Sequence, residues 1–189
     1  MMLKPFRLLL VLLLSLAACG DLGNVISQPT APPLTINYPT MPRTLTEGRV
    51  SRVVDGDTAD VLVNGVRWRV RMLGMDTPES VDPNRPVQCF GREAAAYAKR
   101  LLEGQTVYLE ADASQDDRDQ FDRYLRFVWF ADGRLYNMQM IAEGYAFEYT
   151  YRGNAHKYQR QFRQVQSDAR QAGRGLWSPS TCNGERRSE

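Results

Sequence analysis

A short stretch in the first half of the chain carries residue types that could act on a phosphate group. Arg71 stands five residues before Asp76 and eight before Glu79, where a strand-like alternation turns through Gly74. A cation beside two carboxylates could serve a metal-assisted phosphate site, because hard metal ions prefer oxygen ligands. The same residues could form an ordinary strand end followed by a turn at Pro78. The stretch alone does not decide between the two.

Two further segments place charged residues at the ends of predicted strands. They are Asp55-Gly56-Asp57-Thr58 and Phe121-Asp122-Arg123-Tyr124-Leu125-Arg126. Each is weak by itself, since an Asp-Gly-Asp sequence is most often only a turn. The nearby aspartates Asp116, Asp117 and Asp119 lack the glycine and terminal glutamate of a calcium-binding loop. We therefore interpret their loop as solvated surface.

The strand and helix patterns predict a mainly β domain of the α+β class. Apolar and polar residues alternate over five segments, at residues 47–54, 58–63, 66–73, 106–110 and 124–130. Asn64-Gly65 is a strong hairpin signal between the second and third segments. Helical patterns occupy residues 91–103, 137–143 (capped by Asn137) and 155–172. Five strands with three covering helices indicate a five-stranded OB-fold barrel.

Taken together and in this order, the three charged segments resemble the staphylococcal nuclease (thermonuclease) family. The resemblance extends over residues 47–177, including the three helices. It implies an OB-fold nuclease domain that uses Ca²⁺. The family pattern implies that Asp57 and Asp76 bind calcium through their carboxylates, and Thr77 through its backbone carbonyl. Few protein ligands would leave coordination positions for water and substrate.

The resemblance also assigns the catalytic residues. Arg71 and Arg126 match two arginines that clamp the phosphate, since a planar guanidinium can bind two phosphate oxygens at once. Glu79 matches the proposed general base, which activates a water molecule. Arg126 could instead form a surface ion pair with Asp119 or Asp122. Glu79 could instead be a first-turn helix carboxylate.

Two tyrosines are expected to flank the nucleotide. Tyr124 and Tyr149 fall where the family has such tyrosines, although Tyr151 could take the place of Tyr149. Core packing is an open alternative for both. The family usually has glycine between the tyrosine and the arginine of the third segment, and here we align Leu125 with that glycine. A side chain there could change the approach of Arg126 or crowd the nucleotide.

The resemblance implies an enzyme that hydrolyses phosphodiester bonds of DNA and RNA with low sequence specificity and leaves 3′-phosphate ends. The alternative is a non-catalytic OB-type module that binds nucleic acid or a protein. Such modules are expected to lose the carboxylates and arginines that this chain keeps. With 24 basic and 22 acidic residues, the chain is too evenly charged for binding by broad counterion release. We expect a local site and a monomer.

The N-terminal residues are typical of export rather than of the folded domain. Lys4 and Arg7 precede an apolar run and small residues before Cys19, which resembles a bacterial lipoprotein signal. This predicts an extracytoplasmic protein that contacts the membrane through lipidated Cys19 alone. A plain signal peptide and a secreted protein are the alternative. The expected segments are a lipoprotein signal peptide (1–18), a lipid anchor and proline-rich linker (19–46), a nuclease domain (47–182) and a polar tail (183–189) that is frayed over residues 185–189.

Cys89 and Cys182 remain as a possible pair in an oxidising compartment. A disulfide between them would join the start of the first helix to the end of the domain. It would close a loop of about 90 residues and contribute roughly 4 kcal/mol. Two unpaired thiols are the alternative. A zinc site is not expected, because neither cysteine has a metal-ligating neighbour and His156 is the only histidine.

Overall fold

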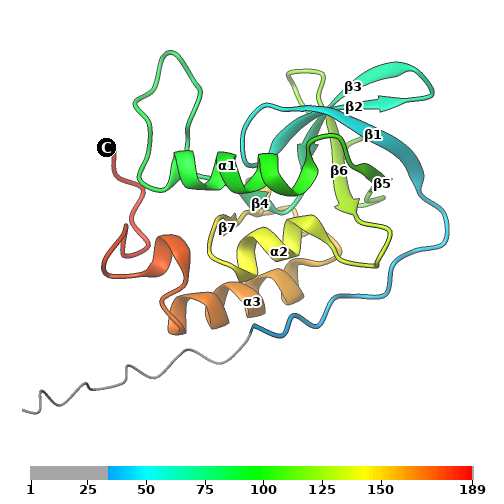
Figure 1. The fold of residues 1–189 in the computed structure, drawn as a ribbon. Coiled ribbons are helices and arrows are strands. Elements are labelled where there is room, and N and C mark those ends of the chain that lie inside the picture. The colour runs from blue at the N-terminus through cyan, green and yellow to red at the C-terminus, as the bar shows by residue number, and fades with distance from the viewer. Residues whose placement is uncertain (1–33, 189) are drawn as a thin grey trace, which may run out of the picture. The chain divides into compact units, whose positions relative to one another are not determined.

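The alternating segments form five strands that close into a barrel in the computed structural model, which describes residues 34–188 (Figure 1). The strands are β1 (Thr46–Val53), β2 (Thr58–Val63), β3 (Val66–Met72), β5 (Thr106–Glu110) and β6 (Tyr124–Trp129). Their order around the barrel is β1-β2-β3-β6-β5. Neighbouring strands are antiparallel except β3 and β6, which are parallel. The predicted mainly β, OB-type barrel is confirmed.

A second, very small sheet continues the chain where β3 leaves the barrel. It consists of β4 (Met75–Asp76) and β7 (Phe147–Glu148), with Asp76 opposite Phe147. Gly74, which has a φ of 73°, makes the turn between β3 and β4. A side chain at Gly74 would also collide with the His156 ring, 2.6 Å from an added Cβ. The turn therefore requires glycine for both its conformation and its space.

The part of the chain that the structure describes has three α-helices, as predicted, and two short 3₁₀ turns in its C-terminal third. They are α1 (Gly91–Leu102), α2 (Tyr136–Ala142) and α3 (Gln159–Gln171), and the turns are η1 (Tyr151–Gly153) and η2 (Gly175–Trp177). Gly104 follows α1 with a φ of 75°, as expected of a helix-ending glycine. α2 packs against α3 and against β6, and α1 packs against β1.

Asn137 is not the N-cap of α2, which corrects the expectation from sequence. The N-cap position is held by Leu135, without a side-chain cap. Asn137 is fully buried; its Oδ1 accepts a hydrogen bond from the Val128 amide (2.8 Å), and its Nδ2 donates to the Leu73 carbonyl (2.9 Å). These backbone groups lie where β3 and β6 separate. The buried amide replaces the ladder bonds lost there.

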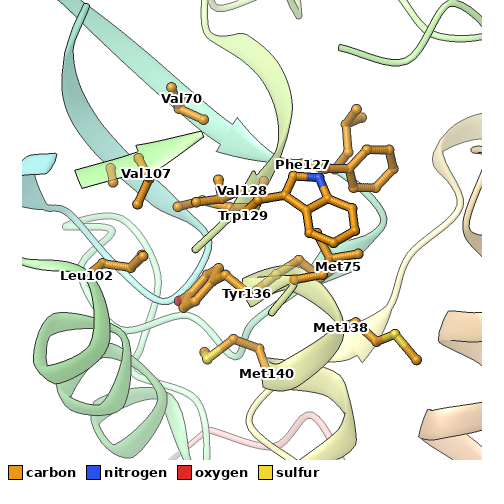
Figure 2. Close-up of a cluster of buried hydrophobic side chains, with 14 of the residues drawn as sticks. Val70, Met75, Leu102, Val107, Phe127, Val128, Trp129, Tyr136, Met138 and Met140 are labelled. Atoms are coloured by element: carbon orange, nitrogen blue, oxygen red, sulfur yellow. The ribbon is translucent and has the colours of Figure 1, made fainter. Parts of the chain in front are cut away.

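The core combines the inward face of the barrel with α2 (Figure 2). The largest fully buried side chains include Trp129, Tyr136, Phe127 and Phe162. All seven residues of α2 are buried. Each large apolar side chain removed from water contributes about 1.5–3 kcal/mol. The Tyr136 hydroxyl on α2 also donates to the Gly56 carbonyl (2.7 Å), so the packing ties α2 to the turn that carries Asp57.

The segment before β1 belongs partly to the folded domain. Ile36, Tyr38, Met41 and Leu45 are partly buried against the core. The linker expected over residues 19–46 therefore ends before β1, because these four apolar side chains pack against the core of the domain. Residues 1–33, with the predicted signal peptide and Cys19, lie outside the described residues. No helix between residues 34 and 188 is long and apolar enough to cross a membrane.

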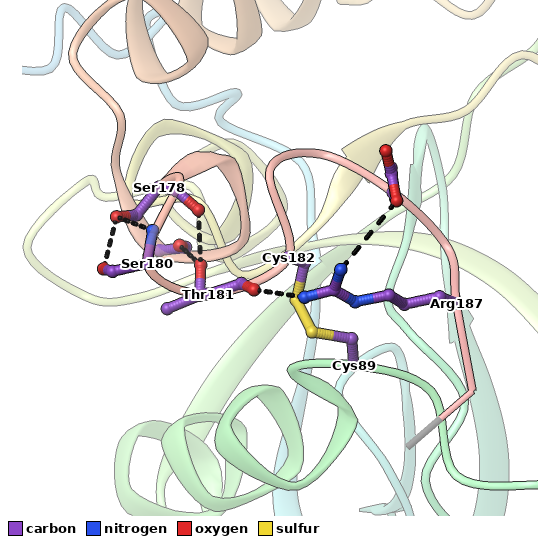
Figure 3. The surroundings of a disulfide bond; sticks show 8 residues. Cys89, Ser178, Ser180, Thr181, Cys182 and Arg187 are labelled. Atoms are coloured by element: carbon purple, nitrogen blue, oxygen red, sulfur yellow. Dashed lines mark hydrogen bonds and ion pairs between the residues drawn. A yellow bond between two sulfur atoms is a disulfide. The ribbon is translucent and has the colours of Figure 1, made fainter.

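The C-terminal residues are held in place, so the fraying expected from residue 185 onwards is not found over residues 185–188. Cys89 and Cys182 form the disulfide, with their Cα atoms 5.8 Å apart (Figure 3). The Cys89 amide donates to the Arg187 carbonyl (2.8 Å), and Ser188 forms a β-bridge with Gln88. The tail therefore runs alongside the loop that leads into α1.

Candidate active site

The arginine at the end of β3 draws two aspartates together. Arg71 Nη2 lies 2.9 Å from Asp76 Oδ1 and 3.3 Å from Asp57 Oδ2. Its Nη1 donates to the carbonyls of Met72 (2.7 Å) and Met75 (2.8 Å). Burial alone would lower the pKa of the guanidinium, but the neighbouring aspartates raise it, so the group stays charged. Both carboxylates therefore converge on one fixed cation.

Asp57 ties the turn before β2 to the turn after β4. Its Oδ2 accepts hydrogen bonds from the Thr77 amide (3.0 Å) and hydroxyl (3.2 Å), and its Oδ1 accepts one from the Thr58 hydroxyl (3.0 Å). The turns approach so closely that a Cβ on Gly56 would lie 2.5 Å from the Thr77 side chain. The structure thus brings together Asp57, Asp76 and Thr77.

A third aspartate supports Asp57 from behind. Asp55 Oδ1 accepts a hydrogen bond from the Asp57 amide (2.9 Å). Burial, and then the charge of Asp57, raises the pKa of the Asp55 carboxyl to about 7. The carboxyl groups of Asp55 and Asp57 therefore lie close together where water only partly solvates them. This agrees with a supporting role for Asp55 rather than a role as ligand.

The oxygen-only donor set fits a hard dication such as calcium. Asp57 and Asp76 would supply carboxylates and Thr77 its carbonyl, and positive charge there would offset the crowding of the aspartates. Within residues 34–188 no group of three or more His, Cys, Asp or Glu side chains could hold a metal ion. A calcium ion here would therefore depend on the Thr77 carbonyl, water and substrate to complete its shell.

Glu79 lies beyond this cluster and holds the loop that follows it. Its Oε1 accepts hydrogen bonds from the amides of Ser80, Val81 and Asp82 at 2.9–3.0 Å. Its own amide donates to the Gln88 side chain (2.9 Å). Since α1 begins only at Gly91, Glu79 is not a first-turn helix carboxylate. Its Oε2 makes none of these loop bonds.

A cleft of about 640 Å³ opens beside the cluster. Its lining includes Arg71 and Asp76, four further arginines and three aromatic residues: Arg85, Arg118, Arg123, Arg152, Phe121, Tyr149 and Tyr151. Phe121 is 69% exposed. Guanidinium groups suit phosphate oxygens, and exposed aromatic faces suit bases. The cleft therefore has the chemistry of a site for a nucleic acid strand.

Comparisons with known proteins agree with this arrangement. A family model described as "Staphylococcal nuclease homologue" matches residues 69–179. A thermonuclease of Staphylococcus hyicus is 41% identical over 130 residues, which cover 69% of this chain and 75% of that protein. A thermonuclease of Staphylococcus intermedius is 38% identical over 128 residues (68% and 74%). Endonuclease YncB of Bacillus subtilis is 37% identical over 132 residues (69% and 61%).

The chain belongs to the staphylococcal nuclease family. Its fold and these relatives identify it as a nuclease, a hydrolase of phosphodiester bonds.

Arg126 does not join Arg71 in the cleft, which corrects the predicted pair of clamps. In the parallel pairing of β3 with β6, Arg71 lies opposite Leu125, and both line the cleft. Successive residues of a strand point to opposite faces, so Arg126 points away. Its side chain is only 7% exposed and pairs with Asp117 (2.5 Å). The alternative that Arg126 forms an ion pair is therefore correct in kind, but its partner is Asp117 and not Asp119 or Asp122.

Arg123 is the arginine that the third segment contributes to the cleft. Asp122 has a φ of 61°, a left-handed conformation that glycine adopts readily and aspartate tolerates. The family's glycine between an aromatic residue and an arginine therefore corresponds to Asp122, flanked by Phe121 and Arg123. Leu125 is not at the glycine position. The sequence signal was Phe121-Asp122-Arg123, but Tyr124-Leu125-Arg126, three positions later, has the same aromatic–X–arginine pattern and was chosen instead.

The two predicted nucleotide-flanking tyrosines have different surroundings. Tyr149 lines the cleft, and its amide donates to the Gly74 carbonyl (3.0 Å). Tyr151 also lines the cleft. Tyr124 stacks on Trp68, with ring centroids 3.9 Å apart, and the Arg118 guanidinium lies 3.9 Å from its ring. With both faces covered, Tyr124 has no face for a base in this arrangement.

Proposed function

We propose that the protein is a calcium-dependent nuclease that cleaves both DNA and RNA with little sequence preference and leaves 3′-phosphate ends. The observation that carries this proposal is the convergence of Asp57 and Asp76 on Arg71, at the edge of a cleft lined by arginines and aromatic rings. The carboxylates suit a hard metal ion, and the cleft suits a sugar–phosphate backbone.

Asp57, Asp76 and the Thr77 carbonyl would hold the calcium ion. When bound, the ion would supply positive charge beside the scissile phosphate and so stabilise the charge that develops there. Arg71 is anchored by two carbonyls and two carboxylates, so its guanidinium is fixed before substrate arrives. A fixed cation loses little free energy to reorganisation during the reaction.

Arg123 would be the second clamp on the phosphate. It now pairs with Asp119 (2.6 Å) and lies over the Phe121 ring, with 5.4 Å between Cζ and the ring centroid. When substrate binds, a phosphate would replace Asp119 as the partner of the Arg123 guanidinium, so the guanidinium charge would stay paired. Glu79 would take the proton of the attacking water through its Oε2, while Oε1 stays on the loop amides.

The cleft accounts for low sequence specificity. Phe121 and Tyr149 line the cleft with ring faces on which any base could stack, and its arginines would contact phosphate. Neither kind of contact reads the edges of a base pair. Contacts to phosphates and to the faces of bases do not distinguish ribose from deoxyribose, so the same cleft would accept both DNA and RNA.

We also propose that the enzyme acts outside the cytoplasm, anchored by lipid on Cys19, as a monomer. The support comes from the sequence: a short apolar run between basic residues and small residues that precede Cys19. The Cys89–Cys182 disulfide fits an oxidising compartment. Replacement of Cys19 by alanine should abolish labelling of the protein by radioactive palmitate in growing cells.

The nuclease assignment is tested by incubating the purified protein with denatured DNA, or with RNA, in calcium, in magnesium alone and in a chelator. We expect both substrates to be degraded only with calcium. The fragment ends should accept radioactive phosphate at the 5′ end without prior phosphatase treatment. Asp57→Asn is the matched inactive control. Degradation in the chelator would contradict the calcium assignment, and fragments with 5′-phosphates would contradict the proposed bond.

A further inference from the structure

The C-terminal tail reaches the carboxylate at the centre of the proposed metal site. Arg186 Nη1 lies 2.6 Å from Asp76 Oδ2, and its Cζ lies 4.1 Å from the Phe147 ring centroid. The other oxygen of Asp76 is taken by Arg71 at 2.9 Å. Both oxygens of a carboxylate expected to bind calcium are therefore engaged by arginines, and one of these comes from more than 100 residues away.

The tail is fixed on both sides of Arg186, which distinguishes this ion pair from an ordinary surface pair. The next residue, Arg187, accepts a hydrogen bond from the Cys89 amide and donates from Nη2 to the Thr181 carbonyl (2.7 Å; Figure 3). On the other side, the Gly184 amide donates to the Leu176 carbonyl (2.8 Å). The Cys89–Cys182 disulfide secures the base of the tail. Much of the entropy that weakens exposed ion pairs is thus already lost.

We propose that Arg186 is a positioning residue that holds Asp76 and competes with the metal ion for it. This inference rests on the proposed function, because it concerns the calcium site of that nuclease. A guanidinium on Asp76 repels an incoming dication and occupies an oxygen that the dication needs. The tail therefore lowers the calcium affinity of the site. The disulfide keeps Arg186 in position, so its loss weakens this effect.

Calcium affinity can be measured without turnover, from the rise of the thermal unfolding midpoint with calcium concentration. The full chain would be kept metal-free in a non-ionic detergent and titrated with calcium chloride alone. We expect Arg186→Gln to lower the apparent dissociation constant for calcium by about five-fold, since one nearby cation is removed. Arg186→Lys keeps the charge and should restore most of the wild-type value.

Arg187→Gln is the matched control. It removes an arginine from the same tail, but Arg187 bonds to Thr181 and lies near Glu185 rather than Asp76. Its calcium affinity should equal that of the wild type. The Cys89→Ser, Cys182→Ser double variant should bind calcium more tightly, and adding Arg186→Gln to it should produce little further change. The unfolding midpoint without calcium shows that each variant is folded.

Unchanged or weaker calcium binding by Arg186→Gln would overturn the inference while leaving the nuclease assignment intact. Tighter binding by Arg187→Gln to the same degree would also overturn it, because the effect would then be one of general charge. Full additivity of Arg186→Gln with the cysteine variant would refute the part assigned to the disulfide. Absence of calcium binding by the wild type would overturn both this inference and the calcium assignment.

Discussion

At the scale of single residues, the site depends on which arginines face the cleft. Arg71 is held by four acceptors and is 13% exposed, whereas Arg126 lies away from the cleft beside Trp68 and Tyr124. Arg123 stands on the loop before β6 and lines the cleft. Three arginines of similar appearance in the sequence therefore have different roles.

Arg123 and Arg126 can be separated by parallel substitution. We expect Arg123→Ala to reduce the rate of DNA cleavage about 100-fold, with little change in stability, because a phosphate contact is lost. Arg126→Ala should lower the free energy of unfolding by about 1–3 kcal/mol, because the Asp117 carboxylate and the Leu125 carbonyl lose the donor that Arg126 supplies. Cleavage rates and urea unfolding of both variants provide the comparison. The reverse pattern would restore Arg126 as the clamp.

His156 makes stability depend on pH. Its ring is buried without hydrogen bonds to either nitrogen, and this burial lowers its pKa despite the Glu148 carboxylate 3.8 Å away. The unfolded chain therefore binds a proton more readily than the folded one. Stability is complete above the unfolded pKa of about 6.5 and falls as the pH drops through it towards the lower folded pKa.

We expect His156→Gln to flatten this dependence below about pH 6.5. Urea unfolding at closely spaced pH values gives the slope for each protein. Carboxylates remote from position 156 contribute equally to both proteins, so the difference in slope reports on His156 together with its neighbour Glu148, 3.8 Å away. Identical slopes would show that the imidazole does not titrate differently on folding.

At the scale of elements, Asn137 connects α2 with the place where β3 and β6 separate. Asn137→Ala would leave the Val128 amide and the Leu73 carbonyl buried without partners. We expect a loss of about 3 kcal/mol in the free energy of unfolding. Asn84→Ala, on an exposed loop, is the control and should change it by less than about 0.5 kcal/mol. Urea unfolding of the two variants measures both effects.

The strands were predictable from the sequence because each one carries its own alternation. All five barrel strands fall within one residue of the expected bounds, helped by the Asn64-Gly65 hairpin. The strands β4 and β7 were missed, since two residues show no period. The burial of Asn137, and the direction of Arg126 away from the cleft, also depend on how β3 pairs with β6, a long-range contact that local patterns do not encode.

At the scale of the whole molecule, the disulfide joins segments 93 residues apart. By loss of chain entropy in the unfolded state, this crosslink should stabilise the protein by about 4 kcal/mol. We expect the Cys89→Ser, Cys182→Ser double variant to lose most of this amount in urea unfolding. Cys19→Ser, which leaves the crosslink intact, should lose none. Equal stability of both variants would mean that the tail is held by its hydrogen bonds alone.

The parallel pairing of β3 with β6 also determines when the site can form during synthesis. No chain that ends before residue 129 contains the complete β6, and Asp76 obtains its strand partner only with β7 at Phe147–Glu148. If the chain is exported N-terminus first, as we propose, Arg71 and Asp57 cross the membrane before the barrel can close. On that proposal the assembled cleft forms on the far side of the membrane, away from the nucleic acids of the cell that makes the enzyme.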